Sequence, residues 1–152
     1  MRALVAFSSL SGNTRDVAHL VADRLTQQGW SVEVFEVGMS RFETIAGQAF
    51  NLACLGSWSV DAGRTPGEVK DFVAKWTEQG IPHPPVAAFG TGETQWGEEF
   101  YCGAAHRLAK FFQSPFPVLE VEQMPNSADE RQRIQAWTDG VLAALNPQEI
   151  AP

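Results

Sequence analysis

The chain has 152 residues, a net charge of −7 at neutral pH and a hydrophobic fraction of 44%. These values predict one soluble domain, residues 1–152, with room for a substantial core. The acidic balance argues against a nucleic-acid partner, whose phosphates would repel the surface. No apolar run approaches the roughly 18 residues that span a membrane, and the N-terminus does not resemble a signal peptide. We therefore expect no membrane contact and a cytoplasmic location.

Short apolar runs alternate with amphipathic stretches along the chain. The runs expected to form strands are 2–7, 31–37, 50–56, 85–90 and 116–122. Helical spacing of apolar residues is clear in Val69–Trp76 and Ile134–Leu145, and in Val17–Leu25 with Arg24 as an exception on the apolar face. Capping boxes at Thr65–Glu68 and Ser127–Glu130 predict two helix starts. This alternation predicts βαβ units and a mostly parallel sheet.

The charges within the apolar runs predict the order of the strands. Runs 50–56 and 85–90 hold no charged residue, and run 2–7 holds only Arg2, whereas runs 31–37 and 116–122 each carry two glutamates. Strands buried on both faces are continuously apolar, and edge strands tolerate charge. We therefore expect an α/β fold, a doubly wound five-stranded parallel sheet of order 2-1-3-4-5 with helices on both faces. Its ligand crevice would lie beyond the carboxyl ends of the central strands.

The turn after the first run, SSLSGNT at residues 8–14, is rich in hydroxyl and amide side chains. Its backbone amides and the following helix N-terminus predict an anion site, where Gly12 lets the backbone approach closely. The turn matches neither the lysine-containing triphosphate loop nor the dinucleotide fingerprint. We expect it to hold one terminal phosphate. The simpler alternative is a serine-rich helix cap.

Two further loops at the same edge of the sheet each contain a tryptophan. Trp58 lies in the loop 57–65, and Trp96 lies in the glycine-flanked loop 91–100. An indole at a binding rim suits stacking on a flat conjugated ring, although a single loop tryptophan is more often only a packed aromatic. Together with the phosphate turn, the two loops predict a ligand with a phosphate at one end and an aromatic ring system at the other.

These motifs resemble those of the flavodoxins, small FMN-binding electron carriers, over nearly the whole chain. Ser9–Thr14 is similar to the family's S/T-x-S/T-G-N-T phosphate loop, Gly90–Glu93 to its G-x-G-D stretch, and Tyr101–Ala104 to its F-C-G-A helix start. The resemblance implies a flavodoxin-like fold, FMN as the cofactor, no metal and no catalytic residue. The expected cofactor-binding residues are Ser8, Ser9, Leu10, Ser11, Gly12, Asn13, Thr14, Ser57, Trp58, Ser59, Val60, Asp61, Gly63, Thr91, Gly92, Glu93, Trp96, Tyr101 and Cys102.

Within this set the resemblance implies distinct roles. Trp96 would stack on the flavin where the family usually has a tyrosine, and backbone groups around Glu93 and Cys102 would face the polar edge of the isoalloxazine. The side chains expected to hold the FMN phosphate are Ser9, Ser11, Asn13 and Thr14.

The middle loop departs from the family's G-x-x-T-W-G pattern. Counted without gaps from Gly56, Val60 falls at the tryptophan that covers the inner ring face, and Asp61 falls at the glycine beside flavin N5. Two alternatives stay open: Trp58 covers the inner face instead, and Gly63 is the residue beside N5.

The leading functional interpretation is an electron carrier and not an enzyme. The resemblance implies redox protein partners, a flavodoxin reductase and acceptor enzymes, which a monomer would meet through an acidic rim near the flavin. The carboxylates expected in that rim are Asp61, Glu93, Glu98 and Glu99. We expect the three histidines (His19, His83 and His106) to be exposed, and we expect the two cysteines (Cys54 and Cys102) to form neither a disulfide nor a metal site.

Three alternatives remain. The stretch TQWGEEF, residues 94–100, is similar to one in the flavodoxin-like activator of manganese ribonucleotide reductase. An FMN-dependent NAD(P)H or quinone reductase is the second, although a stacked Trp96 would block its second substrate. The third is a cofactor-free domain of the response-regulator kind, which ranks last because the chain lacks an acidic magnesium-binding pair after its first strand.

Overall fold

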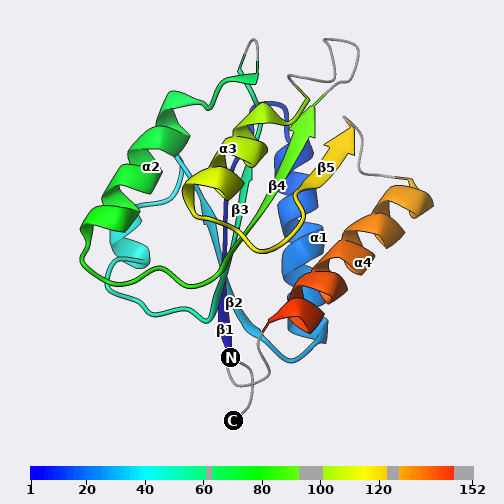
Figure 1. Cartoon of the computed structure of the whole chain (residues 1–152), viewed down its shortest axis with the longest axis horizontal. Coiled ribbons are helices and arrows are strands. Elements are labelled where there is room, and N and C mark those ends of the chain that lie inside the picture. The colour runs from blue at the N-terminus through cyan, green and yellow to red at the C-terminus, as the bar shows by residue number, and fades with distance from the viewer. Residues whose placement is uncertain (61–62, 93–100, 123–126, 146–152) are drawn as a thin grey trace.

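A computed structural model of the chain describes residues 1–60, 63–92, 101–122 and 127–145. Its sheet has five parallel strands in the order β2-β1-β3-β4-β5, as Figure 1 shows. The strands are β1 (Arg2–Ser8), β2 (Ser31–Glu36), β3 (Leu52–Ser57), β4 (Val86–Gly92) and β5 (Leu119–Glu122). This confirms the predicted fold class, the strand order and the placing of the two glutamate-bearing strands at the edges.

Helices cover both faces of the sheet. Those in the described part of the chain are α1 (Asn13–Gln27), α2 (Gly67–Glu78), α3 (Gly103–Phe111) and α4 (Ala128–Ala144), with a short 3₁₀ helix, η1 (Phe42–Thr44), after β2. α1 and α4 lie on one face of the sheet and α2 and α3 on the other (Figure 1). The core residues of α1 and α4 belong to one buried cluster, and those of α2 and α3 belong to a second. Alternating residues of β1 enter the two clusters, which is why its sequence is continuously apolar.

The polar exception on the inner face of α1 has a partner. The Arg24 guanidinium donates from Nε and Nη2 to the two carboxylate oxygens of Asp139 on α4, each at 2.8 Å. The interruption of the apolar pattern therefore marks the place where two helices on one face of the sheet are joined.

Some predicted boundaries shift for identifiable reasons. β5 begins at Leu119 and not at residue 116, after Pro117, which has no amide to donate to a neighbouring strand. β4 runs through Thr91 and Gly92, which pair with Val121 and Glu122, so these two residues lie in the strand and not in the expected loop.

The two predicted helix caps have different outcomes. The Ser127 hydroxyl accepts the amide of Glu130 at 3.1 Å, which confirms a cap at the start of α4. The expected Thr65 cap is wrong, because the N-cap of α2 is Pro66 and no side chain caps that helix. The Pro66 carbonyl instead accepts the amides of Val69 and Lys70, which closes the first turn of α2 without the threonine.

Candidate functional site

The predicted phosphate turn lies between β1 and α1. Ser8 is the last residue of β1 and is buried, and α1 begins at Asn13. The Ser9 hydroxyl accepts the amides of Gly12 at 3.0 Å and Arg15 at 3.3 Å, so the turn is held by its own side chain. Gly12 has φ 98°, a left-handed conformation in which a side chain would be strained. The Ser9 hydroxyl hydrogen can still be donated to a ligand.

The N-cap of α1 is Gly12, which has no side chain to accept the first amides of the helix. Of these amides, that of Arg15 donates to the Ser9 hydroxyl. The amides of Asn13 and Thr14 and the positive end of the helix dipole suit an anion. Thr14 is buried in the first turn of α1, and its hydroxyl is hydrogen-bonded to the Thr91 hydroxyl of β4 at 2.8 Å. The residues present therefore fit a phosphate group, and Thr14 and Thr91 join two of the predicted segments.

Arg15 is a neighbour of the turn that sequence reasoning missed. Its guanidinium donates to both carboxylate oxygens of Glu36 at the end of β2, at 3.0 and 2.6 Å. The hydrogen bond from Arg15 holds the pKa of the Glu36 carboxyl below its ordinary value. Because Glu36 neutralises this cation, the groups that the turn offers to an anion are mainly backbone amides and hydroxyls. The sequence signal for this ion pair was Glu36 itself, a glutamate at the carboxyl end of an edge strand next to the turn.

Trp58 lies at the carboxyl end of β3, beside the end of β1. Its indole Nε1 donates to the Ser8 hydroxyl and its backbone amide donates to the Ser8 carbonyl, both at 3.3 Å. The Ser57 hydroxyl donates to the Trp58 carbonyl at 2.6 Å. These contacts fix a half-buried indole next to the phosphate turn.

Described residues later in this loop form an antiparallel bridge and contact α3. Val60 and Arg64 exchange two backbone hydrogen bonds with N–O distances of 2.8 and 3.1 Å. Gly63 is buried at φ 73°, and the Ser59 hydroxyl accepts the amide of Ala104 at 3.0 Å. Ser59, Val60 and Gly63 therefore share one loop that is tied to the start of α3. Asp61 lies outside the described residues.

The start of α3 has an unusual backbone. Cys102, its N-cap, has φ 52°, and a Cβ on the next residue, Gly103, would lie 2.4 Å from the carbonyl oxygen of Gly63. Burial raises the pKa of the Cys102 thiol to about 12, so the thiol stays protonated at neutral pH. Burial raises the pKa of Cys54 to the same value, and both cysteines are free, as predicted.

The end of β4 supplies the third predicted segment. Thr91 is buried, and the Tyr101 ring lies 3.3 Å from the position that a Cβ on Gly92 would occupy. Burial also raises the pKa of the Tyr101 hydroxyl well above its ordinary value. The expected flavin contacts Glu93 and Trp96, and the rim carboxylates Glu98 and Glu99, lie outside the described residues.

The sheet register brings these segments to one edge. Ser8 of β1 is the parallel partner of Ser57 of β3, which in turn pairs with Gly90 of β4. Leu10, in the turn above them, is 73% exposed.

All three histidines are exposed, as expected. No group of three or more metal-ligating side chains is found in the described ranges. No helix there is long and apolar enough to cross a bilayer.

The chain is a doubly wound α/β protein with a turn that fits an anion at the switch point of its open sheet; flavodoxin is a standard example of this strand order. A sequence model of the family described as flavodoxin matches residues 5–137. The chain belongs to the flavodoxin family.

Individual relatives agree with this assignment. Probable flavodoxin 1 of Bacillus subtilis is 22% identical over 147 residues, 93% of this chain and 90% of that protein. Probable flavodoxin 2 of the same organism is 27% identical over 138 residues, 88% and 89% of the two chains. The solved structure of oxidised flavodoxin 1 from Bacillus cereus superposes with a TM-score of 0.82 at 20% identity, covering 96% of this chain and 100% of that one. Flavodoxins bind FMN and transfer electrons, which confirms the cofactor and the broad class expected from the sequence.

Proposed function

We propose that this protein carries electrons on FMN from a flavodoxin reductase to acceptor redox enzymes, without a catalytic activity of its own. The observation that supports this most directly is the N-terminus of α1, whose N-cap Gly12 has no side chain, behind the turn held by Ser9. An anion-binding turn at the switch point of a doubly wound sheet suits the phosphate of a mononucleotide.

The residues divide between the two ends of the cofactor. At the phosphate end, Ser11 and Asn13 would donate from their side chains, together with Ser9, Thr14 and the first amides of α1. The hydroxyl of Thr14 can donate to a phosphate oxygen while it accepts from Thr91, because a hydroxyl has one hydrogen and two lone pairs.

At the ring end, this chain would supply an aromatic cover and a backbone frame. Trp58 beside Ser8 suits the inner ring face, and Trp96 would cover the outer face. The loop of Ser59, Val60 and Gly63 would border the N5 side, and Tyr101 and Cys102 would border the opposite polar edge. Bound FMN would accept and release the electrons, and the chain's own residues would orient it and exclude water.

The two enzyme-related alternatives depend on the loop 93–100. The first alternative rests on the similarity of residues 94–100 to a ribonucleotide reductase activator. The second requires room over the flavin for another substrate. Both concern residues outside the described ranges. None of the contacts found in the described residues favours either alternative over the carrier.

Binding of FMN and of riboflavin by the same protein tests the proposal. Ser11→Ala removes one hydrogen bond to a charged group, so we expect FMN affinity to fall about tenfold while riboflavin affinity stays unchanged. Flavin fluorescence quenching measures both. Ser40→Ala, at an exposed serine after β2, is the matched control and should change neither affinity. Equal affinity of the parent for the two flavins would contradict the assignment of the turn as a phosphate site.

A further inference from the structure

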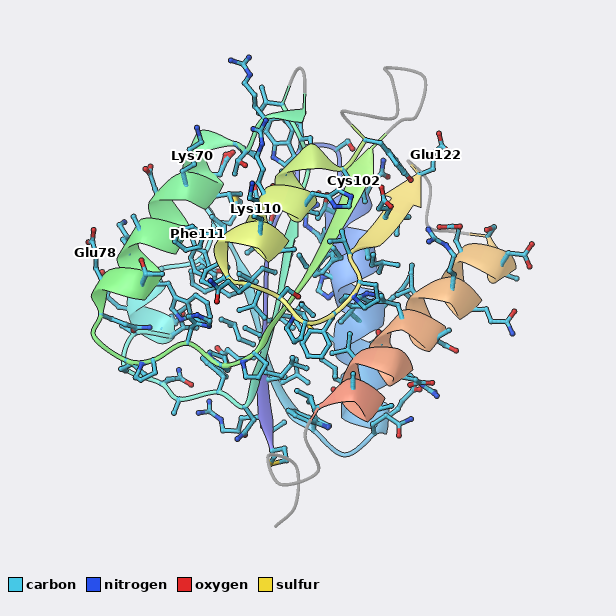
Figure 2. All side chains as sticks on the ribbon, viewed as in Figure 1. Lys70, Glu78, Cys102, Lys110, Phe111 and Glu122 are labelled. Carbon is cyan, nitrogen blue, oxygen red and sulfur yellow. The ribbon has the colours of Figure 1, made fainter. Side chains whose placement is uncertain are left out.

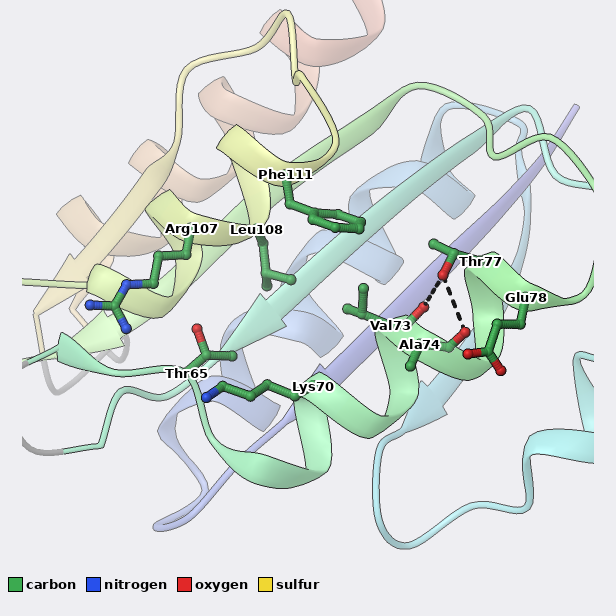
Figure 3. Close-up of a pocket in the computed structure, with 9 residues that line it drawn as sticks. All are labelled: Thr65, Lys70, Val73, Ala74, Thr77, Glu78, Arg107, Leu108 and Phe111. Carbon is green, nitrogen blue, oxygen red and sulfur yellow. Dashed lines mark hydrogen bonds between the residues drawn. The ribbon is translucent and has the colours of Figure 1, made fainter.

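A groove of about 480 Å³ runs between α2 and α3, outside the crevice described above. Apolar side chains form its floor and one wall, and polar side chains lie at its two ends (Figure 3). The lining residues are Thr65, Lys70, Val73, Ala74, Thr77, Glu78, Arg107, Leu108 and Phe111. The family-like motifs of this chain lie elsewhere, so FMN binding does not account for the groove.

The charges at the groove are arranged by end. Lys70 and Arg107 lie at the end nearest Thr65, and Glu78 lies at the opposite end (Figure 3). Within the described ranges, neither Lys70 nor Arg107 makes an ion pair, whereas Arg15, Arg24 and Arg133 each do. The groove lining therefore carries two cations and one carboxylate on a chain of net charge −7, and its Lys70 and Arg107 end favours an anionic group of a partner.

Phe111 gives the groove an exposed aromatic anchor. Phe111 is 61% exposed. Its side chain stands over the groove with Leu108 (Figure 3), on the face of the molecule turned to the viewer in Figure 2. Its ring touches Phe112 edge-to-face, with centroids 4.8 Å apart, and Phe112 itself is buried in the core. Lys110 is the preceding residue on the same helix. Exposed apolar surface with polar residues around it is typical of protein interaction sites.

The shape of the groove suits a helix. Its α2 wall runs from Lys70 to Glu78, which is about 12 Å along a helix axis or roughly two turns. A third helix can lie between two others when its apolar side chains fill the groove, with anchors at i, i+3, i+4 and i+7.

We propose that this groove binds an acidic amphipathic helix of the redox partner. The partner's apolar side chains would pack on Val73, Leu108 and Phe111, and its carboxylates would meet Lys70 and Arg107. Because Thr65 directly follows Arg64, which is bridged to Val60, a helix bound here lies next to the loop assigned to the flavin edge. The identity of the occupant as a redox partner rests on the proposed function.

The test uses FMN-loaded protein and a labelled helical peptide of about 15 residues with leucines at i, i+3, i+4 and i+7 and three glutamates in one end turn. We expect saturable binding by fluorescence polarisation, weakened roughly fivefold or more by Lys70→Gln with Arg107→Gln and also by Phe111→Ser. The control Lys75→Gln lies on the same helix but lines a different hollow with Phe42, and it should bind like the parent. A peptide with lysines in place of the glutamates should bind at least tenfold more weakly.

Three outcomes would overturn the proposal. One is equal binding of the acidic and basic peptides, another is an equal loss with Lys75→Gln and with the paired groove variant, and the third is no peptide binding at all. The third outcome includes two cases in which the groove has another occupant. One occupant is decanoate, a small amphiphilic carboxylate, and the other is a second copy of the chain. FMN affinity is measured on every variant, so a failure of the proposed function is seen separately from a failure of the groove.

Discussion

The contact between Gly63 and Gly103 joins the loop after β3 to the start of α3. Three backbone atoms of Gly63 lie within 3.0 Å of the position that a Cβ on Gly103 would take. Backbone atoms cannot move aside as a flexible side chain can. Any side chain at residue 103 must therefore displace the Gly63 loop or the helix start.

Gly103→Ala should for this reason change the flavin site without removing a single proposed ligand. We expect FMN and riboflavin affinities to fall together by roughly tenfold, and the separation between the two one-electron reduction potentials of bound FMN to change. Gly140→Ala is the control, because a Cβ there meets open space within α4. It should leave the flavin properties unchanged and stabilise the helix by about 1 kcal/mol. Identical reduction potentials for the two variants would contradict the placement of Gly63 at the flavin edge.

The geometry of the candidate site was predictable from the sequence where its side chains form local motifs. The turn 9–12 and the segment at Tyr101 and Cys102 were found from short residue patterns, and the fold brings them to one edge of the sheet. The Ser8–Trp58 and Thr14–Thr91 contacts were not predictable, because each joins residues at least 50 positions apart whose meeting depends on strand register. Whether Asp61 or Gly63 lies beside flavin N5 stays open, because the length of the loop, and not the type of residue, decides which of them reaches that position.

At the scale of whole elements, burial and charge predicted more than boundaries did. The glutamates in β2 and β5 identified the edge strands because a charge is tolerated only where one face of the sheet is accessible. The start of α2 was wrongly placed because Thr-Pro before a helix is compatible with either residue as the N-cap. The Arg24–Asp139 bridge was not foreseen, since it depends on α1 and α4 sharing a face.

The β2–α1 junction gives stability a pH dependence. The pKa of Glu36 is lowered from 4.5 by the hydrogen bond from Arg15, so the folded state binds this proton less tightly than the unfolded state. The stabilisation is therefore complete above about pH 4.5 and is lost as pH falls through the folded pKa. We expect Glu36→Gln to be less stable at pH 7, by about 0.5–1 kcal/mol, and to lose less stability on acidification than the parent.

Urea unfolding between pH 3 and pH 7 measures this difference. Glu33→Gln, on the same strand, removes a carboxylate for which no ion pair is found in the described residues, and it should keep the parent's pH profile. Parallel profiles for Glu36→Gln and the parent would show that the Arg15 pair does not couple folding to this proton.

At the scale of the whole molecule, we expect charge to be unevenly distributed around the proposed cofactor. The chain carries −7 in total, and carboxylates are frequent in the loops expected at the rim, yet Lys70 and Arg107 flank the groove on the α2–α3 face. A partner with a basic face and an acidic helix would be turned into one orientation by these opposite signs. Electrostatic complementarity of this kind mainly raises association rates and favours one docking geometry.

Salt should therefore slow electron transfer through the rim more than it changes the bound cofactor. With a basic c-type cytochrome as the acceptor probe, we expect the second-order rate of oxidation of the reduced, FMN-loaded protein to fall about tenfold between low salt and 0.3 M, because the Debye length shrinks below the distance between the charged surfaces. Glu98→Gln with Glu99→Gln should flatten this dependence. Asp23→Asn with Glu33→Gln removes the same charge from α1 and β2, away from the rim loops, and should flatten it less. Equal salt dependence in the two double variants would mean that net charge alone, and not an acidic rim, steers the encounter.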